Sequence, residues 1–259
     1  MGYGDALLVS GHARLAQQKD PRKILVLHQR KPAWSDVWEH NPRIVRWGTP
    51  GDFQLLYGRS LETNMRPYHL AKTARRWHYN LDFRPEVGEL YFSEEELQFA
   101  SRFEPYVIIE PNIKPGASPN KDWGWDRWHR FSELARNEGI KLFQLGMFAA
   151  RRLANTTFIE TKSFRLGCAV LSRAKAFVGS EGGLHHAAAA LNIPGVVIFG
   201  GFTPVELTGY QMHRNLGVSL GNACGMRLPC SHCHREMAKI PPERVIEQLK
   251  EVMRESCHS

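Results

Sequence analysis

Residues 177–201, FVGSEGGLHHAAAALNIPGVVIFGG, decide the fold. The stretch begins with apolar residues ending at Ser180, passes through Glu181-Gly182-Gly183 into an alanine-rich segment, and returns to the apolar run GVVIFGG. Short apolar runs bounded by turn residues predict buried strands, and the alanine-rich segment predicts a helix. The stretch therefore predicts a strand–helix–strand unit of a parallel sheet.

The glycines at the start of this predicted helix have two interpretations. Without side chains, Gly182 and Gly183 let a ligand approach the backbone N–H groups at the positive end of the helix dipole, which favours a phosphate. The same glycines also suit a tight strand-to-helix turn that binds nothing. The two interpretations have equal weight on the residues alone.

The alternation of strands and helices continues through the C-terminal half. Apolar runs predict strands in YVIIEPN, KLFQLG and KAFVGS, and amphipathic patterns predict helices in WDRWHRFSELARNEG, FRLGCAVLSRA and PPERVIEQLKEVMRES. This order predicts a doubly wound parallel sheet. We place the boundary between two halves near residues 100–106, which gives domains 1–104 and 105–259.

The N-terminal half has a weaker pattern. We expect a buried helix over residues 6–18, a buried strand in KILVLHQ and a more exposed strand in PRIVRWG. The basic and aromatic residues 60–80 suit a helix with a mixed surface. No run of about 20 apolar residues predicts a membrane span, and the N-terminus lacks the features of a signal peptide. We therefore expect a cytoplasmic protein, with peripheral contact at the inner membrane face.

The chain has 259 residues and a net charge of +8, from 34 Lys and Arg against 26 Asp and Glu. This surplus favours anionic partners, which include phosphorylated donors, acidic glycans, anionic membrane surfaces and nucleic acid, and does not choose among them.

Residues 177–201 resemble the C-terminal signature of glycosyltransferase family 9, the ADP-heptose:lipopolysaccharide heptosyltransferase-like proteins. Glu181 takes the place of an aspartate in that signature, Gly183 that of a glycine, and His186 that of a histidine. The resemblance implies an α/β fold of two Rossmann-like domains (GT-B type), with the N-terminal one shortened. It also implies that a nucleotide-sugar donor binds at Ser180, Glu181, Gly182, Gly183 and His186.

Two further segments carry the same resemblance. Lys121, in PGASPNKDWGWDRWHRF, falls where the family places a lysine near the donor phosphates, and a cation there would offset charge on the departing diphosphate. Asp5, in GYGDALLVSG, corresponds to the family's proposed general base, which takes a proton from the acceptor hydroxyl. Read without the resemblance, Lys121 is a surface lysine and Asp5 is a helix N-cap.

Three of the five cysteines lie within ten residues, in CGMRLPCSHCHRE. Cys224, Cys230 and Cys233 with His234 or Cys257 have the ligand types of a tetrahedral zinc or iron site. The alternative is a set of reduced thiols in a loop, because a second Cys-x-x-Cys pair is absent. Such a metal would be structural, since the resemblance implies catalysis without a cofactor.

The sequence thus predicts an inverting transferase that moves a sugar, such as a heptose, to a glycan acceptor such as lipopolysaccharide or capsule. A second hypothesis is a nucleic-acid-binding protein or a DNA-modifying glycosyltransferase, supported by the net charge and the basic–aromatic stretch 66–79. A third is a relative that binds the donor without turnover.

Overall fold

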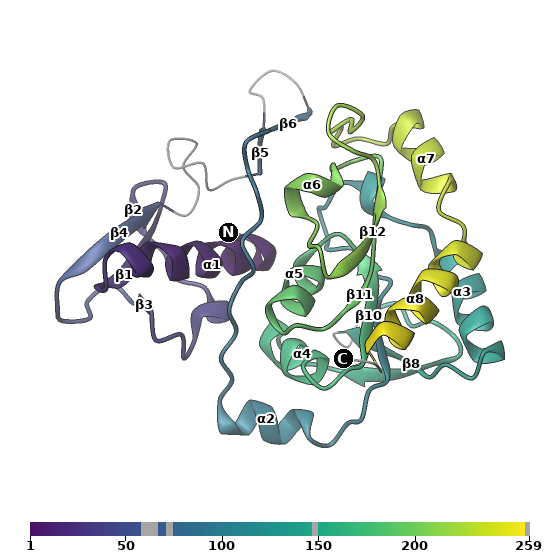
Figure 1. Cartoon of the computed structure of the whole chain (residues 1–259), viewed down its shortest axis with the longest axis horizontal. Coiled ribbons are helices and arrows are strands. Elements are labelled where there is room, and N and C mark those ends of the chain that lie inside the picture. The colour runs from purple at the N-terminus through teal and green to yellow at the C-terminus, as the bar shows by residue number, and fades with distance from the viewer. Residues whose placement is uncertain (58–66, 71–74, 147–149, 257–259) are drawn as a thin grey trace.

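The computed structural model describes residues 1–57, 67–70, 75–146 and 150–256. Figure 1 shows a larger body built on a six-stranded sheet, with a small sheet and a long helix beside it. No helix among these residues is both long enough and apolar enough to cross a membrane.

The six-stranded sheet is parallel throughout, with the order β12-β11-β10-β7-β8-β9. Its first strand, β7, lies at the centre, and the next two strands along the chain continue on one side of it. The chain then crosses to the other side of β7 for the last three strands. This is the order of a dinucleotide-binding Rossmann sheet, and its switch point lies between β7 and β10. The strands are β7 (Val107–Glu110), β8 (Leu142–Gly146), β9 (Thr156–Glu160), β10 (Ala176–Ser180), β11 (Gly195–Gly200) and β12 (His213–Gly217).

Helices cover both faces of this sheet (Figure 1). On one face, Ile108 and Phe177 pack in a core with α4 (Phe164–Leu171) and α5 (Gly183–Ala190). Their strand neighbours point the other way and pack with α3 (Trp125–Asn137) and α8 (Pro242–Ser256). Burial on both faces explains why these strands are continuous apolar runs.

The helix α1 (Tyr3–Lys19) joins the two parts of the molecule. It packs against α5, and its buried residues Ala6, Leu7 and Val9 belong to the same core cluster as Ile24 of the small sheet and the residues of α4 and α5. The short helix η1 (Asp36–Trp38) closes the other side, where Trp38 Nε1 donates to the Ala6 carbonyl at 2.8 Å. The two parts therefore share one hydrophobic core.

The small sheet is centred on β1 (Lys23–His28). β1 pairs in parallel with β3 (Ile44–Val45) and β4 (Phe53–Tyr57), and antiparallel with β2 (Lys31–Pro32). The strand predicted in PRIVRWG is only two residues long, and both are buried rather than exposed. Two α/β units, the N-terminal one small, agree with the predicted two-domain α/β architecture. The two sheets lie on either side of residue 104, and the domain boundary there stays a prediction.

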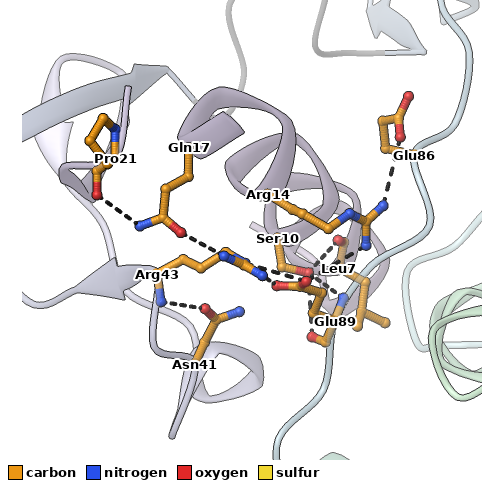
Figure 2. Close-up of polar contacts among 9 residues, drawn as sticks. All are labelled: Leu7, Ser10, Arg14, Gln17, Pro21, Asn41, Arg43, Glu86 and Glu89. Atoms are coloured by element: carbon orange, nitrogen blue, oxygen red, sulfur yellow. Dashed lines mark hydrogen bonds and ion pairs between the residues drawn. The ribbon is translucent and has the colours of Figure 1, made fainter. Parts of the chain in front are cut away.

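The segment 86–89 crosses α1 at close range (Figure 2). A Cβ atom on Gly11 would lie 2.6 Å from the Val87 carbonyl oxygen, and one on Gly88 would lie 2.7 Å from the Leu7 carbonyl oxygen. The Glu89 backbone N–H donates to Ser10 Oγ at 2.9 Å, and the Glu89 carboxylate binds Arg43 Nε at 3.0 Å. The close approach at Gly11 and Gly88 and these polar contacts hold α1 against the segment 86–89, which leads toward the larger sheet.

Arg165 of α4 makes a second tie between the two parts. Its guanidinium binds the Glu96 carboxylate of α2 (Glu94–Ala100) at 2.7 and 2.5 Å, and it donates to the carbonyls of Asp36, Glu39 and Tyr91. Burial opposes ionisation of Glu96, but the bonds from Arg165 and Ser93 outweigh it and lower the Glu96 pKa.

The helix predicted over residues 60–80 is wrong. Within the described part of that stretch, β5 (Tyr68–Leu70) and β6 (Trp77–Tyr79) form an antiparallel pair, and the rings of Tyr68 and Trp77 lie 4.8 Å apart. Residues 58–66 and 71–74 lie outside the described residues. The backbone of Trp77 also donates to the Gly225 carbonyl at 2.8 Å, a contact with a distant segment that helical periodicity cannot reveal.

The remaining predictions for the larger sheet agree with the structure, with differences at the ends. The first helix begins at Tyr3, so Asp5 is its third residue and Gly2 is the N-cap, which corrects the N-cap interpretation of Asp5. The sequence analysis did not predict several of the shorter elements. These are the strands β2, β4, β9 and β12, the helix α2, and the short helices η1, η2 (Pro119–Lys121), α6 (Val205–Thr208) and α7 (Ser231–Ala238).

Candidate functional site

The predicted site residues meet at the switch point of the six-stranded sheet. Lys121 ends the short helix η2 on the loop after β7, and Glu181 directly follows β10. Since β7 and β10 are neighbouring parallel strands, these two loops leave the sheet at the same edge. Ligands of doubly wound sheets bind outside the carboxyl ends of the strands at this position.

Lys121 and Glu181 form an ion pair in which the Lys121 ammonium donates to the Glu181 carboxylate. Their side chains are 17% and 5% exposed. Burial alone would raise the Glu181 pKa, but the positive charge of Lys121 and the hydrogen bonds from Lys121 and Thr208 lower it. Glu181 is therefore ionised at neutral pH and holds the ammonium at the sheet edge.

Two adjacent histidines of α5 lie below this pair, and both are buried, His185 at 0% and His186 at 4% exposed. Burial, Lys121 and His213 lower the His186 pKa to about 3, so the ring is neutral. His186 Nδ1 lies 2.8 Å from the Tyr210 hydroxyl, and burial raises the Tyr210 pKa. The hydroxyl therefore keeps its proton and is hydrogen-bonded to Nδ1, while the other ring nitrogen, Nε2, lies 3.9 Å from Glu181 Oε1.

The N-terminal end of α1 contacts α5 beside these residues. A Cβ atom on Gly4 would lie 2.7 Å from His186 Cδ2, and one on Gly183 would lie 3.6 Å from the Tyr3 Cβ. Asp5 follows Gly4, and its carboxylate accepts from the Gly2 backbone N–H at 3.2 Å. The structure therefore brings the first turn of α1 to the first turn of α5.

Lys114 adds a second cation on the loop after β7. A point at the Cβ position of Gly2 would be 3.6 Å from Asp5 Oδ2 and 3.8 Å from Lys114 Nζ, so both charged groups lie close to Gly2. Lys114 is exposed, and no motif in the sequence selected it.

The other predicted donor residues lie at the start of α5. Gly182 is its N-cap and Gly183 its first residue, so the backbone N–H groups of the first turn point away from the helix body. Ser180 is 7% exposed, and its hydroxyl has no hydrogen-bond partner among the residues that the structure describes. These features can accept an anion, as helix N-termini do.

The cysteines form a separate group. Each of Cys224, Cys230 and Cys233 offers a sulfur, and the three sulfurs lie within 4.8 Å of one another, with 2.8 Å between those of Cys224 and Cys233. His234, which was predicted as a ligand, is exposed and does not belong to this group. Cys257 lies outside the described residues.

The fold and the site define a class. A Rossmann-ordered sheet with a cation and a helix N-terminus at its switch point, joined to a second and smaller α/β unit, is the arrangement of a GT-B type glycosyltransferase. The chain belongs to glycosyltransferase family 9 (heptosyltransferase), whose model matches residues 66–240. The predicted resemblance is confirmed, and family membership favours the transferase prediction over the nucleic-acid-binding one.

Individual relatives agree with this assignment. The lipooligosaccharide heptosyltransferase 2 of Campylobacter jejuni is 24% identical, with 73% of this chain and 71% of that protein covered. Among solved structures, the ADP-heptose lipopolysaccharide heptosyltransferase II of E. coli has a TM-score of 0.50 at 19% identity, over 65% of this chain. The chain spans 54% of the length of that structure.

A third relative matches almost the whole chain. The iron-containing dodecameric glycosyltransferase TibC of enterotoxigenic E. coli has a TM-score of 0.64 at 17% identity, over 98% of this chain and 74% of that one. At this identity the likeness concerns the fold.

Three residues at the site were not selected from the sequence. Tyr210 and Lys114 are single residues in loops, and Asn120 lies in η2 directly before Lys121. Their importance comes from contacts with residues far away in the chain, which spacing does not encode. Only the position of Asn120 directly before Lys121 could have selected it.

Proposed function

We propose that this protein transfers a sugar from a nucleotide-sugar donor to a hydroxyl of a glycan acceptor. ADP-heptose is the first donor to test and a lipopolysaccharide core the first acceptor, because the relatives named above are heptosyltransferases. The observation that carries the proposal is the Lys121–Glu181 pair at the switch point, next to the first turn of α5.

In this proposal the donor diphosphate lies over the first turn of α5. The backbone N–H groups of that turn bind phosphate oxygens, and the Lys121 ammonium neutralises the charge that grows on the leaving diphosphate. Glu181 keeps the ammonium in place before the donor arrives. Its longer side chain replaces the aspartate of the family signature.

Asp5 is the general base of this proposal. The acceptor oxygen attacks the anomeric carbon while its proton passes to the Asp5 carboxylate. The bond from that carbon to the diphosphate oxygen breaks, and its electron pair leaves with the nucleoside diphosphate. A single displacement of this kind inverts the configuration at the anomeric carbon. The position of Asp5 on the helix turn that contacts His186 supports this role.

We also propose that the three cysteines hold a structural zinc or iron ion. Thiolates are the ligands that these metals prefer, and the three sulfurs converge within 4.8 Å, so the residues fit such an ion. The hydrogen bond from Cys233 lowers the Cys224 pKa, which favours a thiolate there. TibC, which is iron-containing, offers a parallel with the same fold. The ion would supply a cross-link, and the sugar transfer uses none of its chemistry.

The experiment that tests the transferase is a thermal-shift screen of the protein against ADP-, UDP-, GDP-, CDP- and TDP-sugars. A ligand that binds only the folded state adds about 2.7 kcal/mol of stability at a hundredfold excess over its Kd. We expect one nucleotide class to shift the melting temperature, and turnover of that donor with a truncated lipopolysaccharide to follow. Folded protein that no donor shifts at millimolar concentration would contradict the proposal.

A further inference from the structure

The segment 224–230, called here the cysteine loop, touches three parts of the molecule at once. Its two ends, Cys224 and Cys230, are members of the sulfur cluster, and the third member, Cys233, lies one helical turn further on in α7. A metal ion bound by all three sulfurs would therefore join the two ends of the loop and close it.

The first contact of the cysteine loop is with the turn that carries Lys121. Asn120 directly precedes Lys121, is 7% exposed, and uses its whole side-chain amide on the loop. Its Nδ2 donates to the Met226 and Leu228 carbonyls at 2.6 and 2.7 Å, and its Oδ1 accepts from the Cys230 backbone N–H at 3.1 Å. Two donors and one acceptor are thus all satisfied by one loop.

Ser118 repeats this connection one residue before η2. Its hydroxyl donates to the same Met226 carbonyl at 3.0 Å, and it accepts from the Asn120 backbone N–H at 3.3 Å. The Lys121 backbone N–H in turn donates to the Ser118 carbonyl at 3.1 Å. Both side chains that flank this turn are therefore bound to the cysteine loop.

The second and third contacts are with the end of β11 and with the N-terminal part. Backbone N–H groups of Cys224 and Gly225 donate to the carbonyls of Gly201 and Phe202 at 3.0 and 3.2 Å. On the other side, the Gly225 carbonyl accepts from Trp77 of β6 at 2.8 Å. A displaced cysteine loop would thus release the Lys121 turn and the β6 strand together.

We propose that a metal ion on Cys224, Cys230 and Cys233 fixes the position of Lys121 through Asn120, and so sets the affinity of the site for the donor diphosphate. Asn120 is the positioning residue of this link. The choice of a nucleoside diphosphate as the ligand rests on the proposed function. The proposed link between the metal and the Lys121 turn is argued from the hydrogen bonds of the structure and does not depend on that function.

The link is tested first without any nucleotide. Hydrogen–deuterium exchange is followed over residues 112–124 in protein loaded with Zn²⁺ or Fe²⁺ and in chelator-stripped protein, for the wild type and for Asn120→Asp. The variant keeps the shape of the side chain, but a carboxylate cannot donate to the Met226 and Leu228 carbonyls. The control is Asn222→Asp, since Asn222 is exposed near the same loop and, within the described part of the chain, its side-chain amide hydrogen-bonds only to Ser219.

We expect stripping to speed exchange over residues 118–123 in the wild type and in Asn222→Asp. In Asn120→Asp the exchange over residues 118–123 should already be fast in the metal-loaded protein, and stripping the metal should increase it little. The variant should still bind one metal ion per chain. The proposal would be overturned if the wild type exchanged equally fast with and without metal, or if the effects of stripping and of Asn120→Asp were independent. It would also be overturned if the wild-type protein bound neither ion.

The second test uses ADP as the probe. Titration calorimetry should show about a tenfold weaker Kd for ADP after stripping, the same loss in Asn120→Asp, and no further loss when both are combined. ADP that binds stripped and loaded wild type equally would refute the regulation of the site. Failure of every nucleoside diphosphate to bind loaded wild type would instead refute the proposed function, while the exchange experiment still decides the link.

Discussion

Gly4 of α1 lies against the imidazole of His186 in α5, so closely that a Cβ atom at Gly4 would come within 2.7 Å of His186 Cδ2. The first helix of the small part thus reaches the first turn of the helix that carries the family signature. The contact needs a residue without a side chain, although the Gly4 backbone itself is ordinary helix.

Gly4→Ala is expected to push these two helices apart. Overpacking of a tight contact costs about 1–3 kcal/mol, and the shift should also displace Asp5 from the donor. Urea unfolding and steady-state turnover measure both effects. Gly2→Ala is the matched control, because a Cβ there meets its nearest atom at 3.6 Å and should cost less than about 1 kcal/mol. Equal stability of the two variants would contradict the contact.

The Lys121–Glu181 pair makes a prediction that separates stability from turnover. Glu181→Gln leaves a largely buried ammonium without its counter-ion and should cost about 3–5 kcal/mol. The double variant Lys121→Met/Glu181→Gln removes both charges and should regain most of that stability. Turnover should stay at least about a hundredfold down, because the diphosphate has lost its cation. A double variant with wild-type turnover would remove Lys121 from the mechanism.

Asp5→Asn tests the proposed base. The amide cannot take a proton, so turnover should nearly vanish while the Kd of the donor stays within about twofold, since general-base catalysis contributes about 10²–10⁴-fold to the rate. Donor titration and turnover with a saturating acceptor check this. Asp126→Asn is the control, an exposed carboxylate in the first turn of α3. If Asp5→Asn turns over normally, another group is the base.

Stability should fall in mild acid because of three buried histidines. Burial lowers the pKa of His186 to about 3 and of His213 to about 4, and that of His185 lies well below its usual value. Between these values and the unfolded pKa of about 6.5, the unfolded chain binds more protons than the folded chain, so acid favours unfolding.

Each of these histidines should therefore remove up to about 1.4 kcal/mol per pH unit below pH 6.5. Urea unfolding at several pH values from 7.5 to 5 measures the slope. In His213→Gln the slope of the unfolding free energy against pH should be smaller than in the wild type, because up to one proton fewer is taken up on unfolding. A slope that the variant leaves unchanged would show that His213 titrates normally in the folded protein.

Arg165→Lys is expected to loosen the tie between α4 and α2. Arg165 is 6% exposed and holds the Glu96 carboxylate with two nitrogens, which a lysine ammonium cannot reproduce. We expect a loss of about 2–4 kcal/mol in urea unfolding. Arg130→Lys, at an exposed pair with Glu243, should cost less than about 1 kcal/mol. Comparable losses in both variants would rule out a special role for Arg165.

The larger sheet could be predicted from the sequence because its central strands are buried on both faces. Runs such as VII at 107–109 and GVVIFG at 195–200 are apolar throughout, whatever surrounds them. The edge strands β9 and β12 each have one buried apolar residue, Ile159 and Leu216, among mostly polar ones, so no pattern distinguished them from loops. The segment around Trp77 was misread for a related reason, since its strand pairing depends on the distant Gly225.

The site was predictable only where a motif marked it. Lys121, Glu181 and His186 were selected by their resemblance to the family signature, and the structure brings them together. Asn120 and Tyr210 act through hydrogen bonds to the Leu228 carbonyl and to His186, and the spacing of such partners follows from the fold. His234 lies outside the sulfur group, because proximity in the sequence does not give the direction of a side chain on α7.

The core that continues from β1 through α1 into α4 and α5 has a mechanical consequence. The two parts cannot swing open like a hinge, because separation would expose apolar side chains such as Leu7 and Leu184 to water. Any motion on substrate binding must be a small slide of α1 along α5, of the shear kind. In the proposed transfer, donor and acceptor would therefore meet on a surface that is assembled before either arrives, and little binding energy would be spent on closing around them.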